Sequence, residues 1–107
     1  MKINLGKREL IHFIGIGGIG MSGLALIMNG LGFRVQGSDI SENKNIDRLK
    51  QKKIPIFLNH NKNNLKNSTV LVISTAIKKN NPELVQAKKL KLPIYTRGEM
   101  LGHIVSL

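Results

Sequence analysis

The chain has 107 residues, 41% of them hydrophobic, which is enough for one domain with a core and leaves no room for two. It contains no cysteine, which excludes a disulfide framework and a thiolate metal site and agrees with a reducing compartment. Lysine and arginine outnumber aspartate and glutamate by 17 to 6, for a formal net charge of +11, so we expect an anionic partner: nucleic acid, a membrane surface or a phosphorylated small molecule.

The first third of the chain predicts a strand, a glycine-rich turn and a helix. Residues 10–14 form a β-rich apolar run, and residues 19–31 read as a helix. The apolar stretch 13–28 follows Lys7 and Arg8 as in a signal peptide. Five glycines interrupt that stretch, however, and a membrane span needs about 20 apolar residues. We therefore predict no targeting or transmembrane segment.

The middle of the chain continues the alternation. Residues 33–37 predict a second strand, residues 44–53 a lysine-rich helix, and residues 54–58 a third strand. Pro55 lies near the start of the third strand and suits the edge of a sheet. The Asn/Lys-rich stretch 59–67 is the expected flexible loop.

The next strand and helix have clear boundaries. Residues 70–73 are continuously apolar, which is typical of a parallel strand covered on both faces. The triplet 81–83, Asn-Pro-Glu, predicts a helix start with a capping Asn, Pro at the first helical position and an acid in the first turn. Leu84, Ala87 and Leu90 are expected to face the core from this helix.

The C-terminal segment completes the pattern. Residues 93–95 predict a last strand, and Thr96 with Glu99 predicts a capping box that opens an amphipathic helix. The chain stops at Leu107 within this apolar-faced helix, so we expect an excised domain. Strands and helices that alternate with short connections predict a single α/β domain, a Rossmann-like parallel sheet of about five strands with helices on both faces.

A glycine motif lies between the first predicted strand and helix. Gly15, Gly17 and Gly20 fit G-x-G-x-x-G in the strand-to-helix context that its mechanism requires. The first glycine permits a tight turn, the second lets the backbone approach a diphosphate, and the third lets helix and strand pack closely. Free N–H groups and the helix dipole would then face the phosphates. The alternative is a turn that binds nothing; the context favours phosphate binding.

Other polar residues follow the predicted strands. Asp39 comes 24 residues after Gly15, where an acid bonds ribose hydroxyls in dinucleotide folds, although Asp also caps turns. The segment 74–76, Ser-Thr-Ala, lies at the carboxyl edge where open α/β sheets bind ligands, although Ser and Thr are equally ordinary in turns.

The histidines and the missing motifs argue against catalysis by this chain. His12 lies inside the first strand and is interpreted as structural, while His60 and His103 have no partner at metal-ligand spacing. The sequence has neither a nucleophilic triad nor a P-loop. It therefore indicates a binding site without visible catalytic machinery.

The run 14–23, Ile-Gly-Ile-Gly-Gly-Ile-Gly-Met-Ser-Gly, resembles the opening of the Mur ligases, and most closely the members that join L-alanine to UDP-N-acetylmuramate. Further matches follow in order: Gly37-Ser38-Asp39, His60, Ser74-Thr75-Ala76-Ile77, Asn81-Pro82-Glu83 and Arg97-Gly98-Glu99-Met100-Leu101. The resemblance covers the chain from about Leu10 onward. One departure is Asn59, which stands where the family often has glycine before His60. The sister ligases that recycle murein tripeptide usually lack the Gly-Met-Ser-Gly continuation, so this chain resembles them less than it resembles the L-alanine ligases.

In that family a Rossmann-like N-terminal domain holds the UDP part of UDP-N-acetylmuramate, a central domain binds ATP and magnesium, and a C-terminal domain binds the amino acid. The full-length enzyme phosphorylates the lactyl carboxylate of the sugar, and the amine of L-alanine attacks the acyl phosphate. The resemblance thus implies that residues 1–107 are the substrate-holding domain of a cytoplasmic cell-wall ligase, non-catalytic alone and without a cofactor of its own. Its partners would be UDP-N-acetylmuramate and the missing ligase domains, not nucleic acid or membrane.

The resemblance also implies the residues of the UDP-sugar site. Around the diphosphate these are Gly15, Gly17, Gly18, Ile19, Gly20, Met21 and Ser22. Along the nucleoside and sugar they are Ser38, Asp39, His60, Ser74, Thr75, Ala76, Ile77 and Arg97.

Two functions of other classes stay open. The glycine motif and Asp39 also suit an NAD(P)-binding domain of a dehydrogenase or a redox-sensing module, which would bind NAD or NADP more tightly than a UDP-sugar. A nucleic-acid binder is suggested by charge alone. The lysines are scattered, and aromatic residues for base stacking make up only 4% of the chain.

Overall fold

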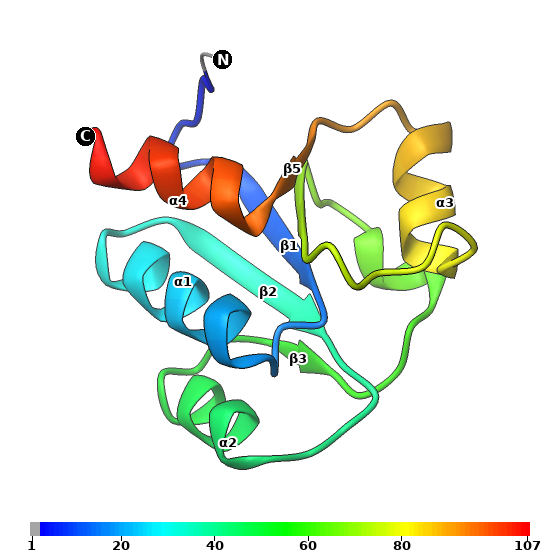
Figure 1. Cartoon of the computed structure of the whole chain (residues 1–107), viewed down its shortest axis with the longest axis horizontal. Coiled ribbons are helices and arrows are strands. Elements are labelled where there is room, and N and C mark those ends of the chain that lie inside the picture. The colour runs from blue at the N-terminus through cyan, green and yellow to red at the C-terminus, as the bar shows by residue number, and fades with distance from the viewer. Residues whose placement is uncertain (1–2) are drawn as a thin grey trace.

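The structure, a computed structural model, describes residues 3–107 (Figure 1). One sheet contains five parallel strands: β1 (Leu10–Ile14), β2 (Arg34–Ser38), β3 (Ile56–Phe57), β4 (Val70–Ile73) and β5 (Ile94–Thr96). The helices are α1 (Ile19–Gly30), α2 (Lys44–Gln51), the 3-10 helix η1 (Lys62–Leu65), α3 (Pro82–Lys89) and α4 (Arg97–Val105). The predicted α/β domain with a five-stranded parallel sheet is confirmed. In residues 3–107 no helix is long and apolar enough to cross a membrane.

The strand order β3-β2-β1-β4-β5 puts β1 at the centre, and its side chains alternate between two different layers. Ile11 and Phe13 belong to an apolar core with α1, α2 and α4, whereas Ile14 packs with residues of η1 and α3. Figure 1 shows the same division, with α3 on the side of the sheet away from α1 and α2. The expected helices on both faces are therefore confirmed, and β3 lies at the sheet edge as Pro55 predicted.

Two local expectations were wrong. The segment 59–67 is not a plain loop, because it contains η1 with Asn64 and Leu65 buried. Leu90 is 51% exposed, because α3 ends at Lys89 and the helical spacing of core positions ends with it. The capping box of Thr96 and Glu99 at the start of α4 is confirmed.

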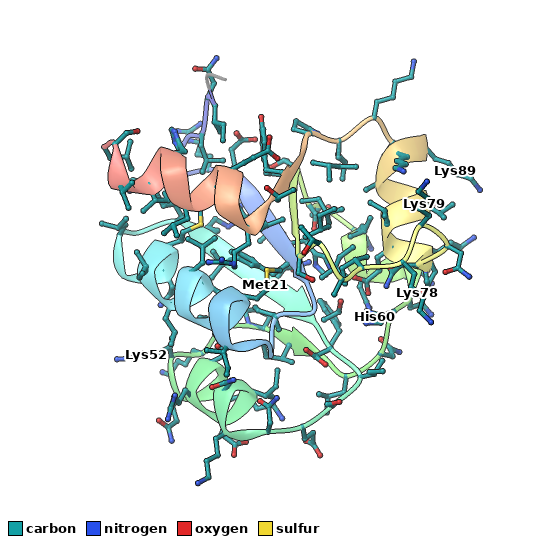
Figure 2. All side chains as sticks on the ribbon, in the orientation of Figure 1. Met21, Lys52, His60, Lys78, Lys79 and Lys89 are labelled. Atoms are coloured by element: carbon teal, nitrogen blue, oxygen red, sulfur yellow. The ribbon has the colours of Figure 1, made fainter. Side chains whose placement is uncertain are left out.

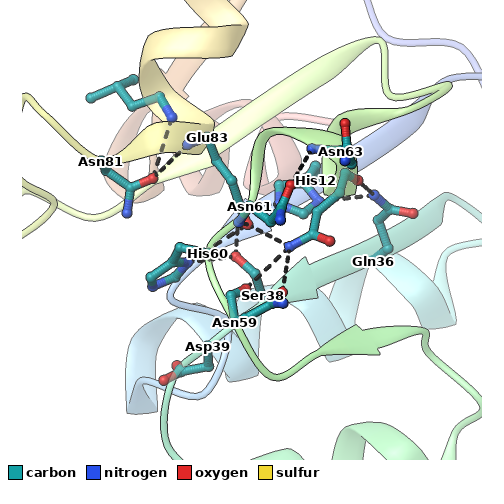
Figure 3. Close-up of polar contacts among 12 residues, drawn as sticks. His12, Gln36, Ser38, Asp39, Asn59, His60, Asn61, Asn63, Asn81 and Glu83 are labelled. Carbon is teal, nitrogen blue, oxygen red and sulfur yellow. Dashed lines mark hydrogen bonds and ion pairs between the residues drawn. The ribbon is translucent and has the colours of Figure 1, made fainter.

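A buried carboxylate, Glu83, connects four elements on the α3 side of the sheet (Figure 3). Its Oε1 accepts hydrogen bonds from His12 Nε2 and Ser38 Oγ, each at 2.6 Å. Its Oε2 accepts from Asn61 N–H at 3.1 Å and Asn64 Nδ2 at 2.8 Å. The cluster thereby joins β1, β2, α3 and the η1 segment, and every contact to the carboxylate comes from a donor.

The proton on His12 follows from its second partner. Gln36 Nε2 lies 2.8 Å from His12 Nδ1 and 2.9 Å from the backbone oxygen of Asn64. That oxygen can only accept, so the Gln36 amide nitrogen faces both groups and donates to Nδ1. His12 therefore carries its proton on Nε2, the atom that donates to Glu83, and its predicted structural role is confirmed by its full burial.

The surroundings of Glu83 favour its ionised form. Burial raises the pKa of its carboxyl group, but the hydrogen bond and the electrostatic attraction of His12, with hydrogen bonds from Ser38 and Asn64, hold the pKa below its ordinary value. Because folding lowers this pKa, the ionised group stabilises the fold above the unfolded pKa of about 4.3. That contribution is lost as pH falls through the lower folded value.

We expect Glu83→Gln to destabilise the domain by about 3 kcal/mol or more, because its NH2 group would face donors whichever way the amide turns. Urea unfolding between about pH 3 and pH 7 measures this, and the variant should also lose part of the fall in stability below about pH 4. The control is Glu42→Gln, since Glu42 is exposed and contacts only Lys50 at 3.6 Å among the described residues. Superimposable stability curves for Glu83→Gln and wild type would contradict the assignment.

Gly37 in β2 is required by packing. A Cβ on Gly37 would lie 2.6 Å from Ile16 Cβ and 2.7 Å from the backbone oxygen of Phe13. We expect Gly37→Ala to cost about 3 kcal/mol through overpacking against backbone that cannot move aside. Gly102→Ala in α4 meets nothing within 4 Å and should gain up to about 1 kcal/mol from helix propensity. Thermal unfolding of both variants measures this difference in stability. Equal melting temperatures for the two variants would contradict the prediction.

Candidate functional site

Five predicted binding segments lie at one edge of the sheet. Because all strands are parallel, the chain leaves each strand at the same edge, where open α/β sheets bind ligands. The glycine loop follows β1, Asp39 follows β2, His60 follows β3, the segment 74–77 follows β4, and Arg97 follows β5.

Direct contacts connect the glycine loop to the strand ends. The N–H groups of Gly15 and Ile16 donate to the backbone oxygen of Ser38 at 2.8 and 3.0 Å. Gly15 has a φ of +79°, which favours glycine, and a Cβ there would lie 3.5 Å from Ile77 Cδ1. The loop is therefore fixed to the end of β2 and touches the segment after β4.

The third glycine of the motif makes room for Arg97. A Cβ on Gly20 would lie 2.9 Å from both Cδ and Nε of the Arg97 side chain. The guanidinium group thus lies against the first turn of α1, although its residue follows β5, far along the chain. The sequence motif assigned this glycine to helix–strand packing; in the structure its close neighbour is a cation.

The N-terminus of α1 has free hydrogen-bond donors. Its N-cap is Gly18, which has no side chain to cap the helix. Within residues 3–107, the N–H groups of Ile19, Gly20 and Met21 have no acceptor. These groups, together with the positive end of the helix dipole, are suited to bind an anion.

The other loop glycines have different surroundings. A Cβ on Gly17 would lie 2.8 Å from Asp39 Oδ2 and 3.0 Å from Ile46 Cδ1, so this glycine lets the turn after β2 and helix α2 close on the loop. A Cβ on Gly18 would meet its nearest neighbour, the Gly15 oxygen, only at 3.5 Å. Gly18 is exposed, so the loop is packed on the Gly17 side and open at Gly18.

The predicted site residues differ in exposure, and three of them have buried side chains. The side chain of Met21 lies in the apolar core, and Ser22 is also buried, its Oγ donating to the Ile19 oxygen at 3.2 Å. Ser38 is fully buried as well. Ile19 is 87% exposed beside the free N–H groups, and Thr75 and Ala76 are exposed on the segment after β4.

Asp39 makes the turn-capping contacts that the sequence left open. Its Oδ2 accepts from Gly17 N–H at 2.9 Å and its Oδ1 from Ser41 N–H at 3.0 Å. Asn43 and Asn45 hold the same loop by donating to the Gly17 oxygen at 3.2 and 3.0 Å. The carboxylate therefore positions the glycine loop, which weakens the analogy with the ribose-binding acid of dinucleotide folds.

His60 is anchored to the buried cluster. Its side chain is 19% exposed, and its Nδ1 lies 3.0 Å from Ser38 Oγ and 3.7 Å from Glu83 Oε2. The preceding Asn59, where the resemblance leads us to expect glycine, has no positive φ. Asn59 instead accepts hydrogen bonds from Asn64 Nδ2 through its backbone and side-chain oxygens, at 3.1 and 3.0 Å.

Sequence reasoning missed the support beneath His60. Glu83 was predicted only as an acid in a first helical turn, and Gln36 and Asn64 carried no prediction. One usable signal was the alternation of side chains along a strand. His12 and Gln36 are paired in register on neighbouring strands, so their side chains point to the same face of the sheet. A buried His and Gln on neighbouring strands require polar partners, but their identity depends on the packing of α3 and η1.

Lysine side chains lie on several elements, and two of them follow a segment of the candidate site (Figure 2). Figure 2 shows Lys78, Lys79 and Lys89 on the α3 side of the molecule and Lys52 beside α2. Lys78 and Lys79 directly follow the segment 74–77. In residues 3–107 no three His, Asp or Glu side chains gather to hold a metal ion.

Comparisons with known proteins agree on one family. The Mur ligase family, catalytic domain, matches residues 10–107. UDP-N-acetylmuramate–L-alanine ligase of Pelagibacter ubique is 65% identical over 107 residues, 100% of this chain and 23% of that protein. The Brucella ovis protein of the same name is 52% identical over 105 residues, 98% of this chain and 22% of the relative. The chain thus spans less than a quarter of the length of these relatives.

Solved structures show the same likeness. UDP-N-acetylmuramate–alanine ligase from Thermotoga maritima superimposes with a TM-score of 0.88 and 35% identity, covering 92% of this chain and 23% of that one. A Neisseria ligase named for UDP-N-acetylmuramate and L-alanyl-γ-D-glutamyl-meso-diaminopimelate reaches a TM-score of 0.81 and 29% identity, covering 87% and 30%. The family match begins at the first residue of β1 and includes every segment of the candidate site, so this chain belongs to the Mur ligase family.

Proposed function

We propose that this chain is the N-terminal, UDP-N-acetylmuramate-binding domain of a UDP-N-acetylmuramate–L-alanine ligase. The observation that carries the proposal is the uncapped start of α1, where three N–H groups are free and Arg97 lies alongside. The relatives from Pelagibacter ubique and Brucella ovis carry that name. The domain arrangement that the resemblance implies supports a substrate-holding role. The Neisseria ligase is less similar to this chain, at 29% identity, than the Thermotoga maritima ligase, at 35%.

The diphosphate is the part of the ligand that α1 would hold. The N–H groups of Ile19, Gly20 and Met21 would donate to its oxygens, and the helix dipole would add roughly 0.3–1 kcal/mol per favourable charge. Arg97 could form charge-assisted hydrogen bonds to the same oxygens. The domain's positive net charge of +11 favours the approach of such an anion.

The nucleoside and sugar would lie along the remaining loops. Asp39, His60 and the segment 74–77 follow neighbouring strands and flank the glycine loop. Exposed Thr75 and Ala76 are suited to contact the sugar. In the full-length cytoplasmic enzyme, ATP and magnesium would be held by another domain, and this chain's share would be to position the lactyl carboxylate for ligation in peptidoglycan biosynthesis.

A chemical-shift titration of the labelled domain with UDP-N-acetylmuramate, and separately with NAD, tests the proposal. We expect the UDP-sugar to shift the amides of residues 19–21 and 74–77, because the first group would bind the diphosphate and the second the sugar side. Shifts caused by NAD alone would move the function to the dehydrogenase or redox-sensor class. With ATP present, the domain should form no amide between UDP-N-acetylmuramate and L-alanine, and detecting that reaction would sink the non-catalytic assignment.

A substitution at Gly18 should separate binding from stability. Gly18 has the extended backbone of an N-cap, with φ −63° and ψ 154°, and an Asp there would itself accept from the free N–H groups of α1. We expect Gly18→Asp to leave stability unchanged or raise it by about a few tenths of a kcal/mol. Affinity for the UDP-sugar should fall about tenfold or more, since the carboxylate repels the diphosphate and occupies its donors. Calorimetric titration and urea unfolding measure the two effects.

Two further variants control this experiment. Gly18→Ser supplies a capping oxygen without charge, so it should weaken binding less than Gly18→Asp does. Gly30→Ala lies at the far end of α1 with nothing within 4 Å and should leave affinity unchanged. Wild-type affinity in Gly18→Asp would show that the start of α1 does not hold the ligand.

A further inference from the structure

The carboxylate of Glu83 lies directly beneath the candidate site. A negative charge there does not help to bind an anionic ligand, so its role needs another explanation. It is fully buried, and a buried charge is costly unless every lone pair is satisfied. Four donors satisfy it, two of them His12 Nε2 and Ser38 Oγ at 2.6 Å. Figure 3 shows His60 at the outer end of this cluster, with Ser38 between its ring and the strands.

The hydrogen atoms of the cluster can be placed by counting donors. Ser38 Oγ carries one hydrogen, and Glu83 Oε1, which can only accept when ionised, receives it at 2.6 Å. Ser38 Oγ then has only lone pairs left for its second neighbour, His60 Nδ1, at 3.0 Å. The hydrogen of that bond must therefore sit on Nδ1. Glu83 Oε2, 3.7 Å from Nδ1, favours the same position by its charge.

This placement decides what His60 offers to a ligand. A neutral ring with its proton on Nδ1 has a bare lone pair on Nε2, which can accept but not donate. Within the described residues Nε2 makes no hydrogen bond. Such an atom suits an N–H or O–H donor, and it does not suit a phosphate oxygen.

We propose that Glu83 is a positioning residue that, through Ser38, holds His60 in the Nδ1–H form and presents Nε2 as an acceptor to a donor group on the nucleoside or sugar of the ligand. The ligand part rests on the proposed function, whereas the proton position does not. Ser38, which resemblance assigned to the ligand itself, acts through His60 in this scheme. The diphosphate remains with α1 and Arg97.

Nitrogen NMR of the free domain tests the proton position without any ligand. At about pH 8.5, where free imidazole is neutral, two-bond ¹⁵N–¹H correlations distinguish a ring protonated on Nδ1 from one protonated on Nε2. We expect His60 to show the Nδ1–H pattern and His12 the opposite pattern, which serves as the internal standard. An Nε2–H pattern at His60 in the wild-type domain would overturn the proposal.

Ser38→Ala removes the link while leaving the bonds from His12 and Asn64 to Glu83 in place. His60 should then shift toward the Nε2–H form, and UDP-N-acetylmuramate should bind about three- to tenfold more weakly. The matched control is Ser68→Ala, because Ser68 is also buried and accepts from Gln36 Nε2 at 3.1 Å, on the far side of His12. It should change neither the pattern at His60 nor the affinity.

A double substitution separates positioning from direct contact. His60→Asn keeps a nitrogen donor near the place of Nδ1 but has no counterpart of Nε2, so it should weaken UDP-N-acetylmuramate binding by a similar factor. Adding Ser38→Ala to His60→Asn should then cause no further loss, because Ser38 acts only through the ring. Independent, multiplying losses would overturn the positioning role. Failure of the wild-type domain to bind the UDP-sugar would instead sink the proposed function, and the NMR result in the free domain would still stand.

Discussion

The hydrogen bonds of Ser38 hold the candidate site together. Its backbone oxygen accepts from Gly15 and Ile16, which fixes the glycine loop at the end of β1. Its hydroxyl group, on the opposite side of the same residue, lies between Glu83 and His60. One residue at the end of β2 thus determines where the loop and the histidine lie relative to each other. A strand permits this because carbonyl groups lie in the sheet while side chains stand perpendicular to it.

The two faces of the sheet bury different kinds of side chain. On the face covered by α1, α2 and α4 the larger apolar cluster supplies most of the hydrophobic core. On the face covered by η1 and α3 a smaller apolar cluster adjoins the buried polar residues His12, Gln36, Ser38, Asn64 and Glu83. Within the described residues every buried polar side-chain atom has a hydrogen-bond partner. Such a cluster tolerates few substitutions, because each loss leaves a buried group unpaired.

The start of α1 differs from the buried polar cluster, because its N–H donors are unpaired and lie at the surface. Asn43, Asn61, Asn81 and Thr96 cap the other helices with their side chains, whereas Gly18 caps α1 with none. The loop before it is nevertheless held by Asp39 from one side and by Ser38 from another. Rigid support beneath unpaired donors is the arrangement that binds an anion with little reorganisation.

Much of the fold was predictable from local pattern. Strand β4 was predicted residue for residue, and the start of α3 followed from the Asn-Pro-Glu triplet, because capping and apolar periodicity involve only neighbours in sequence. The G-x-G-x-x-G spacing correctly placed a turn and an uncapped helix after β1. The helix η1 was missed because its Asn/Lys-rich segment has no apolar periodicity. The expectation for Leu90 was wrong because no glycine marks the end of α3 at Lys89.

The sequence by itself determined the fold class, the family and the set of segments at the candidate binding edge. Parallel strands bring their carboxyl ends to one edge whatever the side chains are. Only the tertiary structure decided what those residues touch. Glu83 lies 71 positions from His12 in sequence and accepts a hydrogen bond from it. Arg97 reaches Gly20, and the carboxylate of Asp39 holds Gly17. Such contacts depend on how helices pack across the sheet, which no periodicity or spacing along the chain specifies.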